Sequence, residues 1–319
     1  MNNLKKIGLS ALAGSLAAVS VNAAELSVSG GAALYIGTSN ENGAGYYSMG
    51  DSVTFSGSGE TDGGLNIAVS FELDGNDANQ VQTYNVMDNR SVTIGTEAMG
   101  TITWSGHGGD SVVSGWDDMT PTAYEEVWDL TAGADTNRIA GASGNNMIRY
   151  DSPSFSGVSV HASYVDAAAG GVSMYSDFGV KISPEMVEGL TLGYATGEVE
   201  ETAGVFIDES VMFVTYAYGP VTVGYQESEK EGNNASNTDE FEAFGITYAV
   251  TEDISVGFAE STVDLGDSST DQVTQNVSFS YTMGGMSVTG SFIDQENAGG
   301  NTAAANDRKG YELGLAFAF

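Results

Sequence analysis

Hydrophobic residues recur at every second position along most of this chain. In its last nine residues, Tyr311, Leu313, Leu315, Phe317 and Phe319 alternate with small or polar residues. Because successive side chains of a β-strand point to opposite faces, this spacing predicts a strand with one apolar face and one small or polar face. The 3.6-residue period of a helix does not fit these segments.

The same period of two predicts about 16 strands along the chain. Their first residues are expected near positions 25, 51, 64, 89, 99, 145, 155, 172, 189, 209, 220, 239, 253, 272, 285 and 309. The expected connections alternate between short turns and longer loops, including a loop at 199–208, and the longest spans 107–144. This alternation predicts an up-and-down antiparallel meander with its turns at one end and its loops at the other.

Two architectures use alternating strands of this kind. A soluble β-sandwich buries its apolar faces between two sheets, whereas a membrane barrel turns them outward onto lipid. The strand length of roughly ten residues, the tyrosines near strand ends and the Ser-, Thr-, Gly- and Ala-rich second face favour the barrel. The predicted fold is therefore all-β, a transmembrane 16-stranded antiparallel up-and-down barrel, which is wide enough to enclose an aqueous channel.

The first residues do not fit this pattern. Lys5 and Lys6 precede a mostly apolar, uncharged run over 7–21, and Val21-Asn22-Ala23 resembles a cleavage site. This order is typical of a secretory signal peptide, and the apolar run is short for a membrane-spanning helix. We therefore expect residues 1–23 to be removed on export and residues 24–319 to form the barrel.

Composition excludes several other classes of protein. The 319 residues include 43 acidic and only nine basic residues, a formal net charge of −34, which disfavours binding to nucleic-acid phosphates. The absence of cysteine excludes a disulfide scaffold and a cysteine zinc site. Aromatic residues spread along the chain argue against disorder.

Two internal segments and the last strand carry a resemblance to a known family. The stretches Gly95–Trp104 and Asn146–Gly157 are similar to the strand–turn–strand motifs on either side of the third loop in Gram-negative general diffusion porins, and Phe319 matches their terminal Phe. The resemblance covers the whole mature chain, although the third loop lacks the Pro-Glu-Phe motif of some members. It implies a homotrimer in the outer membrane, surrounded by lipid and lipopolysaccharide, with Phe319 helping to close the barrel.

The third loop, residues 107–144, is the expected constriction. It is far longer than a hairpin needs, and the resemblance implies that it folds into the lumen. Thr120 and Pro121 are suitable for starting a short helix within it. An ordinary solvated acidic surface loop is the alternative. The acidic side chains expected at the constriction are Asp117, Asp118, Glu125, Glu126 and Asp129.

The opposing positive charges are expected on the barrel wall. By strand parity, Arg149 and Lys181 point into the lumen. Arg138 lies near the end of the third loop. Arg90 shares the outward parity of Val92, so it needs a bulge to turn inward or else lies at the rim. Arg149 has a structural alternative, a pair with Asp151. The expected basic wall is thus Arg149, Arg138, Lys181 and Arg90.

No catalytic or cofactor site is expected. His161 shares an inward face with Ser159, but no G-x-S-x-G motif is present, so a pore-lining histidine is the expectation. The resemblance also implies that a calcium ion could be held near the constriction, with Asp117, Asp118 and Glu126 as the candidate ligands. We expect a passive channel for ions and small hydrophilic solutes that prefers cations. A substrate-selective sugar channel and a non-conducting surface adhesin are the alternatives.

Overall fold

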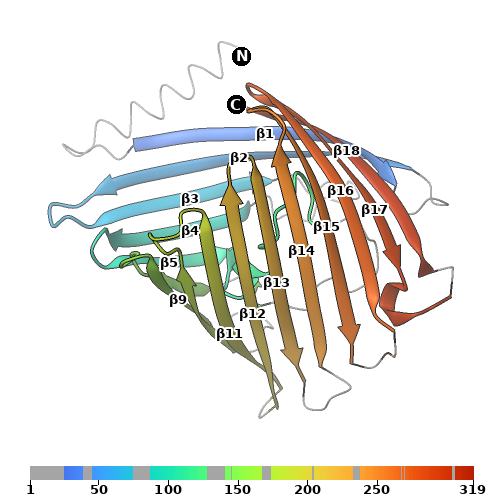
Figure 1. Ribbon diagram of the computed structural model, residues 1–319. Coiled ribbons are helices and arrows are strands. Elements are labelled where there is room, and N and C mark those ends of the chain that lie inside the picture. Colours follow the sequence, from blue (N-terminus) through green and yellow to red (C-terminus); the bar gives the residue numbers. More distant parts are fainter. Residues whose placement is uncertain are drawn as a thin grey trace.

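The protein is a closed antiparallel barrel of 16 strands. The structure, a computed structural model, describes residues 25–319 except 39–44, 75–86, 128–140, 145, 167–173, 203–204, 233–237, 267, 269 and 304–305. Strands consecutive in the sequence lie side by side, as the order of colours in Figure 1 shows. This arrangement confirms the predicted up-and-down meander.

The barrel strands follow the expected order along the chain. They are β1 (Glu25–Thr38), β2 (Tyr46–Glu60), β3 (Asn66–Asp74), β4 (Met87–Thr96), β5 (Gly100–His107), β8 (Met147–Asp151), β9 (Val158–Val165), β10 (Tyr175–Ile182), β11 (Leu190–Thr202), β12 (Val205–Tyr218), β13 (Val221–Glu231), β14 (Asp239–Ala249), β15 (Ile254–Leu265), β16 (Gln272–Met283), β17 (Met286–Glu296) and β18 (Arg308–Ala318).

Three of these strands extend further than the sequence predicts. β2 begins at Tyr46 rather than near position 51. β11 continues to Thr202 and β12 begins at Val205, so the long loop expected at 199–208 is wrong. Glu198 lies opposite Asp208 and Val199 opposite Ile207 in this pair. Antiparallel pairing thus continues through polar residues, whose charges had indicated a loop.

The register gives the barrel wall two chemically different faces. Residues paired across neighbouring strands share a face, and the pairs Ile36–Leu313, Phe258–Val277 and Phe292–Tyr311 place large apolar side chains together on the outer one. These side chains are exposed, although they are hydrophobic. The inner face carries mainly small and polar residues, together with apolar residues such as Phe213 and Phe241 that are buried against the third loop. An exposed apolar outer surface is the arrangement that a lipid bilayer favours.

The first and last strands seal the barrel. β1 pairs with β18 from Gly31–Ala318 to Thr38–Tyr311. Beyond that ladder, Gly30 and Phe319 exchange two backbone hydrogen bonds, each 2.9 Å long. The wall therefore has no open edge at this position, and Phe319 helps to close the barrel, as the resemblance implies.

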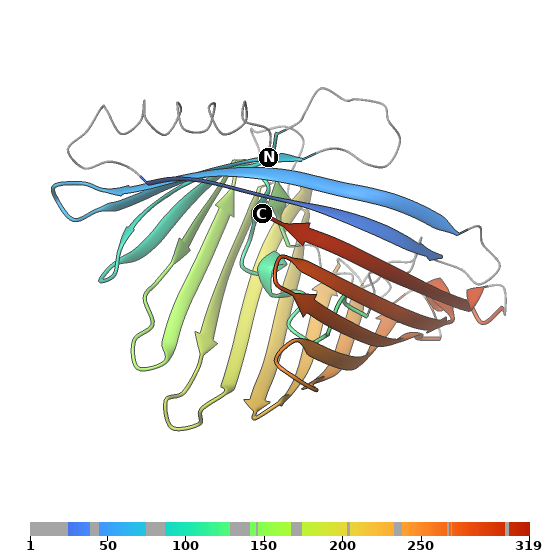
Figure 2. The ribbon, with the colours of Figure 1, turned by 90° about the horizontal axis from the view of Figure 1, so that it is seen from above.

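The third loop contains short elements of its own. Its two ends pair as β6 (Gly109–Asp110) and β7 (Ser143–Gly144), and a 3-10 turn, η1, spans Ser114–Trp116. A second such turn, η4 (Ala298–Gly300), precedes β18. In Figure 2, the green η1 stretch lies within the ring of strands. No helix in the described part of the chain is long and apolar enough to cross a membrane.

Candidate functional site: the third loop against the inner wall

The first part of the third loop is bound to the inner wall by polar side chains. The backbone N–H of Val112 donates to Ser163 Oγ on β9 over 3.0 Å. The next N–H, of Val113, donates to Asp177 Oδ2 on β10 over 2.8 Å. Both acceptors are buried and point to the face opposite the lipid-facing side chains. The loop backbone thus finds its hydrogen-bond partners inside the barrel.

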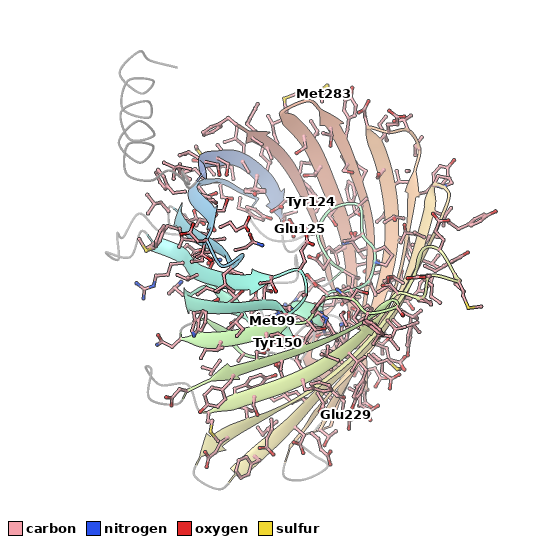
Figure 3. The ribbon with its side chains drawn as sticks, turned by 90° about the vertical axis from the view of Figure 1, so that its left-hand side faces the viewer. Met99, Tyr124, Glu125, Tyr150, Glu229 and Met283 are labelled. Atoms are coloured by element: carbon pink, nitrogen blue, oxygen red, sulfur yellow. The ribbon has the colours of Figure 1, made fainter. Side chains whose placement is uncertain are left out.

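Further strands hold the rest of the described loop. The Met119 N–H donates to Gln226 Oε1 on β13 over 2.7 Å, and the Ala123 N–H donates to Ser278 Oγ on β16 over 3.1 Å. Asn276 Nδ2 on β16 donates to the carbonyl oxygen of Glu125 over 3.1 Å. In Figure 3, Tyr124 and Glu125 lie inside the ring of strands. The loop therefore crosses the inner face from β9 towards the seam.

The short helix expected from Thr120 and Pro121 does not form. The nearest helical turn is η1, which ends at Trp116. Asn276 Nδ2 on the wall donates to the carbonyl oxygens of Glu125 and Glu126, which in a helix would accept from N–H groups four residues further along. The prediction failed because tertiary hydrogen bonds replaced local ones.

Trp116 supplies the main apolar contact between loop and wall. Its ring meets Phe213 on β12 edge-on, with centroids 5.5 Å apart, and His161 on β9 at 5.3 Å. Any side chain at Gly179 on β10 would collide with the Trp116 ring, so the glycine makes room for it. Trp116 is 4% exposed. The packed core of this barrel thus lies between loop and wall.

Arg149 is held in a network at the root of the loop. Its Nε donates to both carboxylate oxygens of Asp151, at 3.1 and 3.2 Å, and its Nη1 donates to the carbonyl oxygens of Asp110 and Ser111 at 3.2 Å each. Asp151 also contacts His161 Nδ1 at 2.6 Å. Arg149 therefore points inward, as parity predicts, and its described bonds tie the wall to the loop backbone.

The same network contains a serine, a histidine and an aspartate in series. Ser159 Oγ lies 2.8 Å from His161 Nε2, and His161 Nδ1 faces Asp151. This connectivity is that of a hydrolase triad. However, the N–H of Val160, the residue after Ser159, already donates to Ser152 Oγ over 2.8 Å, so it is not available as an oxyanion-hole donor. The three side chains form a polar junction beneath Trp116.

We expect Arg149→Met to weaken the loop root while changing ion preference little. The substitution removes hydrogen bonds to a carboxylate and to two carbonyls, which costs about 2 kcal/mol of local stability. A lower unfolding temperature in detergent and more rapid proteolysis of the third loop would show this. Lys181→Met is the matched control, because it removes one positive charge from the same inner face. If Arg149→Met shifts the reversal potential more than Lys181→Met does, Arg149 acts mainly as a pore charge.

The other predicted basic residues lie in different places. Lys181 is opposite Ser159 and shares its inner face, two residues beyond Gly179 towards the short turn. Arg90 is opposite Phe71, whose side chain faces outward. A bulge is present, but it lies at Gly106 on the neighbouring strand β5 and not in β4 itself. Arg90 keeps its outward parity, and its Nη2 donates to the Gly106 carbonyl over 3.2 Å. Its assignment to the constriction is wrong. Arg138 lies outside the described residues.

The predicted acidic residues are spread along the loop. The carbonyl of Asp117 faces Gln226 on β13, whereas that of Glu126 accepts from Asn276 on β16 over 3.3 Å. Among the described residues, no three His, Asp or Glu side chains are grouped to hold a metal ion. Asp117, Asp118 and Glu126 are therefore not brought together as the expected calcium ligands. Asp129 lies outside the described residues.

The inner face of the wall beyond the loop tip, from β1 to β5, carries no Lys or Arg among the described residues. By register, the inner faces of β2 to β5 present mainly Ser, Thr, Gly and Asn, together with the carboxylates of Glu60, Glu72 and Asp74. A cavity of about 680 Å³ borders this region, and Ala33, Asp74 and Ala316 are among its lining residues. The expected basic wall facing the acidic loop is thus missing from the described part of β1–β5.

Sequence reasoning missed the residues that hold the loop. They are six polar side chains on the inner faces of five strands: Ser163, Asp177, Gln226, Asn276, Ser278 and Glu312. Parity places each of them inside the barrel, and that signal was available. The sequence alone does not show which loop atom each one meets.

Comparisons with known proteins agree with this architecture. The family model for Gram-negative porins matches residues 8–275. A variant of the Rh. blastica porin is 16% identical and aligns over 92% of this chain and 100% of its own, with a TM-score of 0.65. A porin structure refined at 1.8 Å is 17% identical with the same coverage and a TM-score of 0.67. A comparison with curated protein sequences finds no match. Because the porin model covers most of the sequence, the chain belongs to the Gram-negative porin family.

Proposed function

We propose that this outer-membrane diffusion channel is passive and prefers cations. Its family and its closed 16-stranded barrel account for the diffusion of ions and small hydrophilic solutes. The distribution of charge on the inner face supports the preference for cations. Glu72 and Asp74 lie on the inner face of β3, and the described inner face of β1 to β5 carries no Lys or Arg; Arg149 is bound to Asp151.

A lumen of one sign selects ions differently from one with opposed charges. Opposed acids and bases create a transverse field, whereas acids alone raise the local cation concentration and lower that of anions. A unit charge about 7 Å away in water changes an ion's energy by about 0.6 kcal/mol, which is close to threefold in concentration. Dissolved salt screens this interaction, with a screening length of roughly 10 Å at 0.1 M. A few carboxylates therefore suffice for a marked cation preference in dilute salt.

We expect a reversal potential of cation-selective sign when the channel separates two KCl concentrations. The double variant Glu72→Gln/Asp74→Asn removes two wall carboxylates and lowers the cation-to-anion permeability ratio severalfold. Planar-bilayer recordings at low salt measure both values. Glu240→Gln is the control, because by register this side chain lies on the outer face beside Glu229. An anion-selective sign in the unmodified protein contradicts the preference.

The alternatives predict different transport results. Swelling of liposomes in sugars of graded size would fall smoothly with solute size for a general channel. A substrate-selective sugar channel would show saturable block of conductance by one sugar, and an adhesin barrel would pass neither sugars nor ions. Smooth size dependence together with ion flow supports the general channel.

We also propose that residues 1–23, which lie outside the described residues, are a cleaved export signal. The mature chain would then assemble as a homotrimer within lipid and lipopolysaccharide. Small outward residues such as Ala32 and Ala162 suit close contact between copies. Mass spectrometry of the mature N-terminus and crosslinking in native membranes test these two points.

A further inference from the structure

Glu312 on β18 joins three separate parts of the chain. Its Oε1 accepts a hydrogen bond from Tyr124 Oη at the tip of the described loop, over 2.5 Å. Its Oε2 accepts one from Tyr46 Oη at the start of β2, also over 2.5 Å. Glu312 is 8% exposed. One buried carboxylate is thus shared by the loop, the last strand and the second strand.

The surroundings of these side chains fit them closely. Gly37 on β1 leaves space that the Tyr46 ring fills, because any side chain there would collide with its hydroxyl end. A side chain at Gly314 would collide with Thr289 Oγ1 and would lie tightly against the Tyr124 hydroxyl. Burial and the bond to Glu312 raise the pKa of Tyr124 above its usual value, so the phenol keeps the proton that it donates. Both tyrosines therefore act as donors to one carboxylate.

This junction lies where the loop reaches the barrel seam. Earlier contacts hold the loop against β9 to β16, and Tyr124 is the described loop residue that reaches β18. Because Tyr124 is bonded directly to Glu312, solutes cannot pass between these two residues. We propose that Tyr124, Glu312 and Tyr46 form a latch that fixes the loop tip and thereby sets the size limit of the pore. The role in size selection rests on the proposed channel function, whereas the attachment of the tip does not.

The strength of the latch follows from its chemistry. Hydrogen bonds to an ionised carboxylate are stronger than those between neutral groups. Loss of one such bond changes the ratio of attached to released states roughly ten- to hundredfold. Tyr124→Phe removes the loop's bond but keeps the aromatic ring. Tyr46→Phe leaves the tip attached and removes one of two supports for Glu312. In Glu312→Gln the amide oxygen still accepts one hydroxyl, so part of the effect remains.

Two measurements test the latch. The chain contains no cysteine, so Ala123→Cys carries a single spin label next to Tyr124 and leaves the side chains of the latch unchanged. We expect Tyr124→Phe to narrow the label's spectrum and, in bilayers, to raise current noise and the size limit for sugars. Glu312→Gln should lie between Tyr124→Phe and the unmodified protein, and Tyr46→Phe should have the smallest effect. The control is Tyr150→Phe, which removes a hydroxyl bonded to the Met99 carbonyl over 2.8 Å at the short turn.

The outcomes separate the latch from the channel. Unchanged label mobility in both Tyr124→Phe and Glu312→Gln overturns the latch, even if the protein conducts normally. An increase in mobility with no change in noise or size limit overturns the role in size selection. An unmodified protein that passes no solute contradicts the proposed channel, while the label still reports whether the tip is attached.

Discussion

Phe279→Arg should prevent stable insertion, whereas Ser280→Arg should be tolerated. The two residues are adjacent on β16 but face opposite ways: Phe279 lies opposite Val256 and Gly290 on the outer face, and Ser280 lies opposite Ser255 and Thr289 on the inner face. An arginine on the lipid side near the bilayer centre costs about 2 to 4 kcal/mol. The same side chain inside the barrel meets water and small residues.

Urea unfolding of the protein in phospholipid vesicles measures the difference in stability between the two variants. The folded fraction is followed by gel electrophoresis of unheated samples, in which the folded barrel migrates differently from the unfolded chain. Phe279 also covers Gly290, where any side chain would collide with its ring, so its loss removes packing as well. Equal destabilisation by both variants would mean that the two faces of β16 do not have the environments that we assign to them. Greater destabilisation by Ser280→Arg would reverse the assignment.

Trp116→Ala should release the first part of the third loop and enlarge the pore. The ring packs between His161 and Phe213, and replacing a buried tryptophan with alanine costs about 3 to 5 kcal/mol. Without the ring, the hydrogen bonds of Val112 and Val113 to the wall have to hold this part of the loop with less support from packing. We expect higher single-channel conductance and faster proteolysis within residues 111–119, while the barrel itself stays folded.

Trp104→Ala provides the matched control for this experiment. Trp104 lies on β5, is 40% exposed, and is opposite Ile148 on the outer face. Its loss removes an aromatic residue of the same size without touching the loop. Conductance that rises equally in both variants would assign the effect to the barrel wall. Conductance that stays unchanged in Trp116→Ala would mean that this ring does not determine the pore.

The fold could be predicted from sequence because alternation is a property of neighbouring residues. Leu313 and Leu315 show by themselves which face of their strand meets lipid, and the inner positions of Arg149 and Lys181 follow from the same rule. Strand ends were less accurate where charged residues continue the pairing, as at Glu198 and Asp208. Charged residues in a row are typical of a loop, although a strand at the rim of a barrel can also contain them.

The third loop was harder to predict because its partners are distant in the sequence. Tyr124 and Glu312 are separated by 188 positions, and no local pattern links them. The expected helix near Thr120 failed for the same reason, since wall side chains bind the backbone there. The expected pairing of acids and bases also failed for Arg90, because its parity was outward and the bulge in β5 did not change it.

The bond between Tyr46 and Glu312 has a consequence for the order of assembly. The two residues are 266 positions apart, on the second strand and the last. Contacts of such long range form late, since many residues must be ordered before the two ends of the chain meet. Tyr124 has no carboxylate of β18 to bind until that strand has been added. The attachment of Tyr124 to Glu312 therefore forms only as the cylinder is completed, after the contacts of the loop with β9 to β16 have become possible.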